Sequence, residues 1–221
     1  MFDKFLQPHA EKIAAGEPYK VYGRAASTMS DTGFKSKVGS YANSAGAKGE
    51  YILFEKLRNP KNGWVPADTP LFCSLKVPGK NSDIDFAIVR GSKVLLIDAK
   101  MYRQDGGFYW NYGDRSTMMR NLSPYTTKSG EPMKLSKSMV MAKDIISRNL
   151  PGFTVESLVI MTTDDSNPKA KKPMTWFLKF PGDITVCNDS SAPRYIRRFL
   201  GGQVRTTDTY NAEKFLRGFV Q

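Results

Sequence analysis

Residues 83–100 read Asp-Ile-Asp-Phe-Ala-Ile-Val-Arg-Gly-Ser-Lys-Val-Leu-Leu-Ile-Asp-Ala-Lys, and this stretch decides the expected fold. Two apolar runs flank Arg90-Gly91-Ser92, which has the composition of a hairpin turn. The second run, residues 94–97, is apolar at every position, which is typical of a central strand covered on both faces. The stretch therefore predicts a β-hairpin in the middle of a sheet.

Charged residues interrupt these two strands at related positions. Asp98 and Lys100 are two residues apart, so their side chains leave the same face of a strand. Asp85 lies about as far before the turn as Asp98 lies after it, which predicts that the two carboxylates are close across the pair. Ionised groups in core-like strands are costly to bury unless something pairs them. A divalent metal ion would pair them.

The rest of the chain divides into helices and strands by its apolar periodicity and its turn residues. The expected helices cover residues 2–15, 44–57, 136–150, 193–200 and 211–219. The expected further strands cover residues 71–77, 108–112, 155–161, 176–180 and 184–187. Residues 113–133 are expected to be a loop. This order predicts an α/β fold with a mixed central β-sheet flanked by helices.

Three regions are expected along the chain. Residues 1–43 would form an N-terminal helix and an irregular basic arm. Residues 44–162 would form the core, and residues 163–221 a C-terminal α/β extension that packs on that core.

Composition limits the chemistry and the compartment. The chain has one histidine, His9, so a multi-histidine zinc site or a histidine-based nuclease site cannot be built. Cys73 and Cys187 are far apart, which favours reduced core thiols over a zinc site or a disulfide framework. No apolar run has membrane-spanning length and no signal sequence is recognisable, so a cytoplasmic protein without a membrane partner is expected.

The chain carries 33 basic and 21 acidic residues, a net charge of +12. This balance predicts attraction to nucleic acid, with DNA the expected partner. The candidate phosphate contacts are Lys48, Lys134, Lys137, Lys171, Lys172, Arg197 and Arg198. The aromatic residues Tyr109, Trp110 and Tyr112 could stack on bases or pack within a sheet.

The two aspartates suit Mg²⁺, with Mn²⁺ as a substitute, because hard cations take oxygen ligands and keep several waters. The carbonyl of Ala99 is the natural third protein ligand. Lys100 would lie beside the metal, where it could orient or deprotonate the attacking water or neutralise developing charge. Glu50 shares a helix face with Leu53, Phe54 and Leu57, so it should point toward the sheet. There it could bind metal or assist catalysis.

These segments resemble the nuclease-related domain (NERD) family, a branch of the PD-(D/E)XK nuclease superfamily. The resemblance rests on Gly46-Ala47-Lys48-Gly49-Glu50, Ile84-Asp85-Phe86-Ala87-Ile88-Val89, Ile97-Asp98-Ala99-Lys100-Met101-Tyr102, and Gly107 with Trp110. Asp98 stands where the family usually has glutamate. The resemblance implies a restriction-endonuclease-like core and metal-dependent cleavage of DNA by Asp85, Asp98 and Lys100, with Glu50 assisting.

Two other functions remain open at this stage. The chain could be a nucleic-acid-binding module that keeps the nuclease fold without cutting. It could also be an interaction protein whose basic surface docks on an acidic partner. The acidic cluster favours the enzyme, since it would repel phosphate in the absence of metal. The oligomeric state is open, and a dimer is compatible with the sequence.

Overall fold

The structure is a computed structural model that describes residues 20–25, 40–59, 63–66, 68–80, 82–111, 116–127, 129–202 and 204–220. Within the first described helix, side chains are described from Gly46 onward. The helix expected at residues 2–15 lies outside these ranges, as does Tyr112.

The centre of the molecule is a seven-stranded sheet in the order β1-β2-β3-β4-β8-β11-β10. Its strands are β1 (Val21–Tyr22), β2 (Leu71–Lys76), β3 (Asp83–Arg90), β4 (Lys93–Lys100), β8 (Thr154–Met161), β10 (Lys179–Phe180) and β11 (Ile184–Asn188). β4 pairs antiparallel with β3 and parallel with β8, and β8 pairs parallel with β11. The mixed sheet confirms the predicted fold class.

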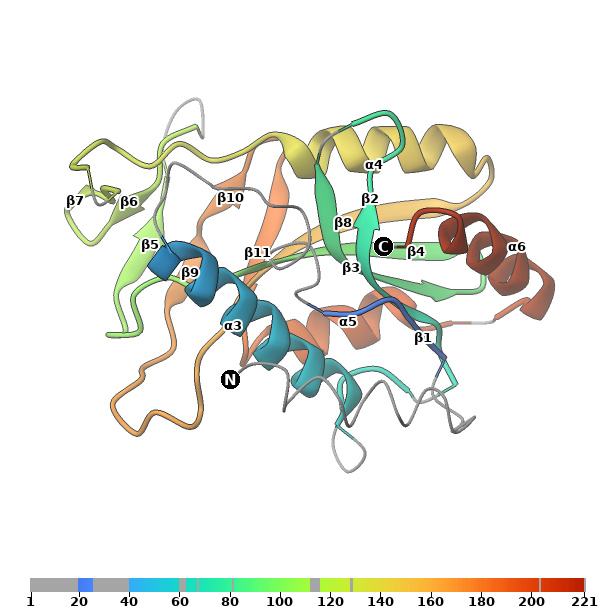
Figure 1. Cartoon of the computed structure of the whole chain (residues 1–221), viewed down its shortest axis with the longest axis horizontal. Coiled ribbons are helices and arrows are strands. Elements are labelled where there is room, and N and C mark those ends of the chain that lie inside the picture. The colour runs from blue at the N-terminus through green and yellow to red at the C-terminus, as the bar shows by residue number, and fades with distance from the viewer. Residues whose placement is uncertain are drawn as a thin grey trace.

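Helices cover both faces of this sheet (Figure 1). They are α3 (Ser40–Arg58), α4 (Ser138–Asn149), α5 (Ala192–Leu200) and α6 (Thr206–Arg217). The buried residues of α3 and α5 share one apolar cluster, and those of α4 and α6 share the other. The molecule is therefore a three-layer α/β/α sandwich, and its two cores lie on opposite faces of the sheet.

The predicted hairpin is confirmed, with Arg90 paired to Lys93 and Phe86 paired to Ile97. Gly91 in the turn has a φ of +57°, a conformation that glycine adopts without steric cost. Every residue from Val94 to Ala99 is buried. Alternate side chains of β4 enter the two core clusters, so the unbroken apolar run reflects burial on both faces.

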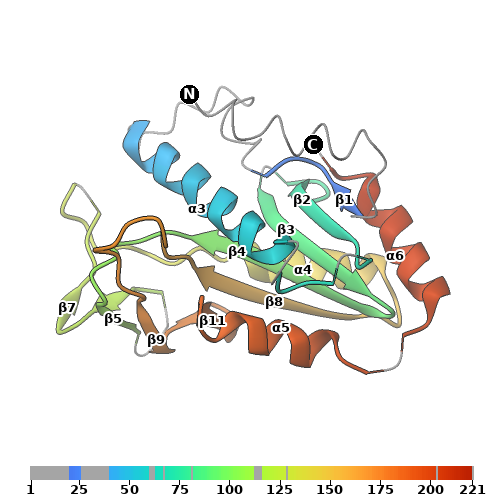
Figure 2. The ribbon, with the colours of Figure 1, turned by 90° about the horizontal axis from the view of Figure 1, so that it is seen from below.

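A second, four-stranded sheet extends the first. Its order is β7-β6-β5-β9, from β5 (Phe108–Trp110), β6 (Met119–Arg120), β7 (Ser123–Pro124) and β9 (Met174–Phe177). β5 follows β4 in the chain, β9 follows β8, and β5 and β9 pair parallel as β4 and β8 do. The small sheet lies beyond the end of the large sheet at which β4 and β8 finish (Figure 2).

Several boundaries differ from the sequence prediction. Residues 21–22 of the expected irregular arm form β1, which pairs parallel with β2. The expected loop contains β6 and β7, and the strand expected at 176–180 is divided between β9 and β10 in different sheets. α3 begins at Ser40 and α6 at Thr206, both earlier than expected. Propensity alone misses these features because they depend on pairing with distant segments.

Both cysteines are free and buried, as predicted. None of the helices in the described part of the chain is long and apolar enough to cross a membrane.

A matched pair of leucine substitutions tests the central position of β4. Leu96 is fully buried, whereas Leu122 is 95% exposed. We expect Leu96→Ala to lower the free energy of unfolding by about 3 kcal/mol, through lost burial and a residual cavity. Leu122→Ala should change it by less than about 0.5 kcal/mol. Urea denaturation followed by circular dichroism measures both values, and equal effects would contradict the described core.

Candidate active site

The site begins where the pairing of β3 becomes irregular. The continuous β3–β4 pairing ends at Phe86 and Ile97, one residue before Asp85 would meet Asp98. The Ala99 N–H instead donates to Oδ2 of Asp85 over 2.6 Å. Ile84 and Phe86 pack in opposite core clusters, so the usual alternation of side chains breaks at Asp85. The Asp85 carboxylate thus occupies the place where the two strands separate.

Asp98 and Lys100 project from the end of β4 as an ion pair. Nζ of Lys100 lies 2.6 Å from Oδ1 of Asp98 and 3.4 Å from the carbonyl oxygen of Ala99. The Asp98 side chain is 13% exposed and that of Lys100 is 34% exposed. The lysine is therefore the more accessible member of the pair. The prediction that both side chains share one strand face agrees with this contact.

Charges in the site shift two pKa values upward. Burial raises the pKa of Asp85 well above its usual range, and the charges of Glu50 and Asp98 raise it further. Loss of hydration lowers the pKa of Lys100, but the negative charges of Asp98 and Asp85 outweigh this effect and raise it overall. Lys100 is therefore a cation at neutral pH, beside carboxylates that repel one another.

Glu50 approaches this group from α3. It is 5% exposed, and Leu53, Phe54 and Leu57 on the same helix face are also buried. The expected orientation of Glu50 toward the sheet is confirmed. The charge of Glu50 contributes, after burial, to the raised pKa of Asp85 near the start of β3.

Gly49 permits this approach. A Cβ atom at this position would lie 2.9 Å from Cβ of Met101 and 3.3 Å from Oγ1 of Thr162. Met101 and Thr162 directly follow β4 and β8. The absent side chain lets α3 contact both strand ends, and that contact fixes the height of Glu50 above the sheet.

The donor set fits an open magnesium site better than a closed metal cage. Among the described residues, no three His, Cys, Asp or Glu side chains are grouped so that they could hold a metal ion by themselves. Mg²⁺ commonly uses one or two carboxylates and completes its shell with water and substrate oxygens. Asp85, Asp98 and the Ala99 carbonyl could supply such a partial shell. A cation there would favour the charged form of Asp85, against the burial and the neighbouring charges that raise its pKa.

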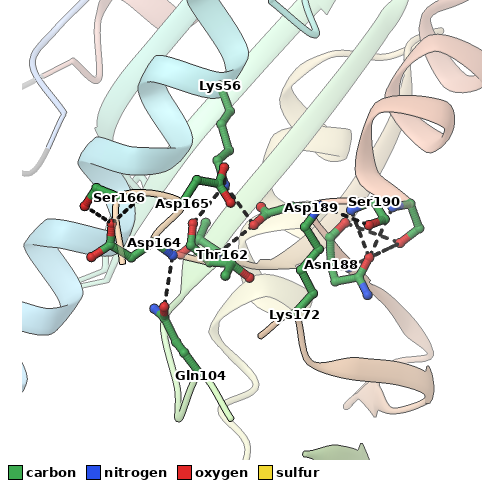
Figure 3. A network of polar contacts seen from close by, with 12 residues as sticks. Lys56, Gln104, Thr162, Asp164, Asp165, Ser166, Lys172, Asn188, Asp189 and Ser190 are labelled. Carbon is green, nitrogen blue, oxygen red and sulfur yellow. Dashed lines mark hydrogen bonds and ion pairs between the residues drawn. The ribbon is translucent and has the colours of Figure 1, made fainter. Parts of the chain in front are cut away.

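A polar network beside the site anchors α3 to the strand ends (Figure 3). Nζ of Lys56 lies 2.8 Å from the Thr163 carbonyl oxygen, 2.8 Å from Asp189 and 2.9 Å from Asp165. Closer to the start of α3, Nζ of Lys48 lies 2.5 Å from Oδ2 of Asp164. This network was not predicted from the sequence, although Asp164 and Asp165 lie just beyond the carboxyl end of an apolar strand, a position that often carries functional side chains.

Asp164 is held in its charged form. The Lys48 ammonium lowers the pKa of Asp164, and the Ser166 hydroxyl and N–H, which both donate to Oδ1, lower it further. Its backbone N–H donates to Oε1 of Gln104, in the segment after β4. Asp164 therefore connects α3, β8 and the exit from β4.

The tyrosines that follow Lys100 form a packed cluster. Tyr102 lies 5.9 Å from Tyr109 and 5.5 Å from Tyr125, measured between ring centroids. Burial raises the pKa of Tyr109 to about 12, and its side chain is fully buried. Nε1 of Trp110 donates to the Asn121 carbonyl oxygen. For Tyr109 the packing alternative is correct, because a buried ring cannot stack on a base.

The candidate phosphate contacts lie on separate surfaces. Lys48, Lys134, Lys137, Lys171, Lys172, Arg197 and Arg198 are all exposed. Lys171 and Lys172 precede β9, and the Lys171 N–H donates to the Gln104 carbonyl oxygen just beyond β4. Arg197 and Arg198 lie on α5. The structure thus brings one pair of lysines to the small sheet and places the arginine pair on α5, in the same helical layer as α3.

The mixed sheet flanked by helices is compatible with a nuclease-like fold. The sequence model of the nuclease-related domain (NERD) family matches residues 45–162, more than half of the 221 residues. The chain belongs to this family. Membership indicates a nuclease-related function and an interaction with nucleic acid. No curated protein and no solved structure matches the chain.

A glycine substitution tests the close approach of α3. We expect Gly49→Ala to lower the free energy of unfolding by about 1–3 kcal/mol, since the added methyl group overpacks the contact with Met101. Gly218→Ala is the control, because its added methyl group would lie 3.4 Å from the Phe215 carbonyl oxygen, an ordinary contact distance, and its φ is −66°. Urea denaturation should show little or no loss of unfolding free energy for Gly218→Ala. A similar loss in both variants would contradict the close contact at Gly49.

A pH series tests the Lys48–Asp164 pair. A carboxyl whose folded-state pKa is lowered stabilises the protein above its unfolded-state pKa, and this stabilisation is lost as the pH falls through the folded value. We expect Asp164→Asn to destabilise the protein by about 1 kcal/mol at pH 7 and by progressively less below about pH 4.

The neighbouring Asp165→Asn is the matched control for this series. The Asp165 side chain is 64% exposed and pairs with Lys56. An exposed ion pair contributes little to stability, so Asp165→Asn should lower the free energy of unfolding by less than Asp164→Asn at neutral pH. Thermal or urea unfolding between pH 3 and 8 measures the difference, and a pH-independent loss for Asp164→Asn would contradict the electrostatic origin.

Proposed function

We propose that the protein is a Mg²⁺-dependent nuclease that hydrolyses phosphodiester bonds in DNA. The observation that carries the proposal is the group formed by Asp85, Asp98 and Lys100 where β3 and β4 separate. Oδ2 of Asp85 is fixed by the Ala99 N–H, and Lys100 lies against Asp98 with part of its side chain exposed. A binding module has no need of buried carboxylates at a phosphate-binding surface.

Each residue has a separate role in this proposal. Asp85 and Asp98 supply carboxylate oxygens and Ala99 its carbonyl oxygen to the cation, and Glu50 assists from α3. When bound, Mg²⁺ lowers the pKa of a water ligand and polarises the phosphate. Lys100 holds its ammonium beside the reacting phosphate and stabilises the negative charge that develops there. The Ala99 N–H keeps Asp85 in place throughout.

Cleavage assays with matched lysine variants test this proposal. We expect wild-type protein to cut plasmid or linear DNA with Mg²⁺ or Mn²⁺ and to stop when EDTA is added. Lys100→Ala should lower the rate about 10²-fold or more, the size found for loss of one transition-state donor. Asp98→Asn should have a comparable effect, since it removes a ligand charge.

Lys214→Ala is the control for charge, because Lys214 is exposed on α6 in the opposite helical layer from α3. It should cut at close to the wild-type rate. Equal cleavage by wild type, Lys100→Ala and Asp98→Asn would overturn the catalytic assignment. DNA binding without cleavage by the wild type would favour the non-catalytic module.

A further inference from the structure

The small sheet carries an exposed aromatic surface that the proposed chemistry does not use. On β9, Trp176 is 78% exposed, Phe177 is 67% exposed and Met174 is 43% exposed, while Thr175 is buried. We call Met174, Trp176 and Phe177 the β9 surface. Exposed apolar side chains that lie next to one another often mark a binding surface.

Positive charge lies directly beside the β9 surface. Residues 169–172 read Lys-Ala-Lys-Lys, and all three lysines are exposed. Nζ of Lys172 contacts Oγ of Ser190 at 3.3 Å, which orients it toward the start of α5. Exposed aromatic rings next to a run of lysines match a ligand with flat apolar faces and a polyanionic backbone.

The rings are held in place by the sheet beneath them. Phe177 meets Phe108 edge to face, with ring centroids 6.1 Å apart and planes at 86°. Phe108 pairs with Met174 across the β5–β9 ladder, and the register shifts before Trp110 pairs with Phe177. A β-bulge of this kind re-aims the side chains that follow it. The bulge explains why consecutive residues Trp176 and Phe177 are both exposed.

The β9 surface is connected to the candidate active site by two short segments. Residues 101–107 lead from Lys100 to β5, and residues 162–173 lead from β8 to β9. The two segments run side by side, since Asp105 pairs with Lys171 in a parallel bridge and the Lys171 N–H donates to the Gln104 carbonyl oxygen. A strand bound on β9 therefore lies on the side of the molecule where β4 presents Asp98 and Lys100.

We propose that the β9 surface binds unpaired nucleic acid, with Trp176 and Phe177 stacking on its bases and Lys171 and Lys172 contacting its phosphates. Bases in a duplex are already stacked on each other, whereas unpaired bases expose their faces to aromatic side chains. The orientation toward the active site rests on the proposed nuclease function; the binding itself does not. The substrate class is then DNA that contains a single-stranded segment.

Binding measured without cleavage tests the inference. Wild-type protein in EDTA is titrated into a fluorescein-labelled 20-mer of thymidine and, separately, a 20-base-pair duplex, and anisotropy gives both dissociation constants. We expect Trp176→Ala to raise the Kd for the single strand roughly tenfold, the effect of losing one base–aromatic stack. The Kd for the duplex should change less than about twofold.

Tryptophan fluorescence gives a second readout. Stacking on a base should quench Trp176, so the thymidine 20-mer should quench wild-type fluorescence, and Trp176→Phe should bind but lose most of the quenching. Tyr210→Ala is the control for a generic exposed aromatic residue, because Tyr210 is 63% exposed on α6. It should leave both affinities unchanged.

The double variant Lys171→Ala with Lys172→Ala tests the phosphate contacts. It should weaken binding of both probes and reduce the slope of log K against log salt concentration by about 2.

Three results would overturn the inference: no binding of the single strand by wild type, an unchanged single-strand Kd in Trp176→Ala, or equal losses for both probes. An altered molecular mass in Trp176→Ala with unchanged Kd values would identify a protein-docking surface instead. Circular dichroism checks that each variant folds.

A wild type that binds the single strand through Trp176 but cuts nothing with Mg²⁺ would overturn the proposed nuclease and leave this inference standing. If the wild type cuts DNA with Mg²⁺ but Trp176→Ala leaves the single-strand Kd unchanged, the inference about the β9 surface is overturned and the proposed nuclease stands.

Discussion

Burial and mutual repulsion of carboxyl groups are the constraint around which this site is arranged. Asp85, Asp98 and Glu50 lie at one end of the central strands, and burial first, then the charges of Glu50 and Asp98, raise the pKa of Asp85. Three features hold them there: the Ala99 N–H on Asp85, the Lys100 ammonium on Asp98, and the α3 contact that Gly49 permits. The N–H and the ammonium offset part of the cost, whereas the helix contact positions Glu50.

Local patterns were sufficient to predict the centre of the molecule. The hairpin at residues 83–100 has a tight turn and two apolar strands, so its register follows from counting outward from Gly91. The same count predicts Asp85 opposite Asp98, but the regular pairing ends one residue earlier and Asp85 accepts a hydrogen bond from the Ala99 N–H. The buried face of α3 follows from helical spacing alone, which is why the orientation of Glu50 could be foreseen. These features depend on residues within one hairpin or one helix.

Features that join distant segments could not be foreseen. Nothing near Lys48 in the sequence identifies Asp164 as its partner, because the pair exists only after α3 packs on β8. The pairing of β1 with β2 likewise joins two segments that are far apart in the sequence, so neither segment alone predicts it. Trp176 resembles an ordinary core aromatic residue in a short strand, and its exposure depends on the bulge between β5 and β9. For Tyr109, in contrast, the sequence favours packing within a sheet over stacking on bases, and the fold buries this ring.

The paired exits of β4 and β8 have an architectural consequence. The small sheet begins from neighbouring segments that leave the large sheet together, and the β5–β6–β7 part of it is inserted between β4 and α4. Lengthening or exchanging residues 111–134 would remodel what this outer lobe contacts without altering the register of β3 and β4. The fold thus keeps the insert between β5 and α4 apart from the strands that carry Asp85, Asp98 and Lys100. The insert could therefore change in length or sequence while the positions of these three residues stay the same.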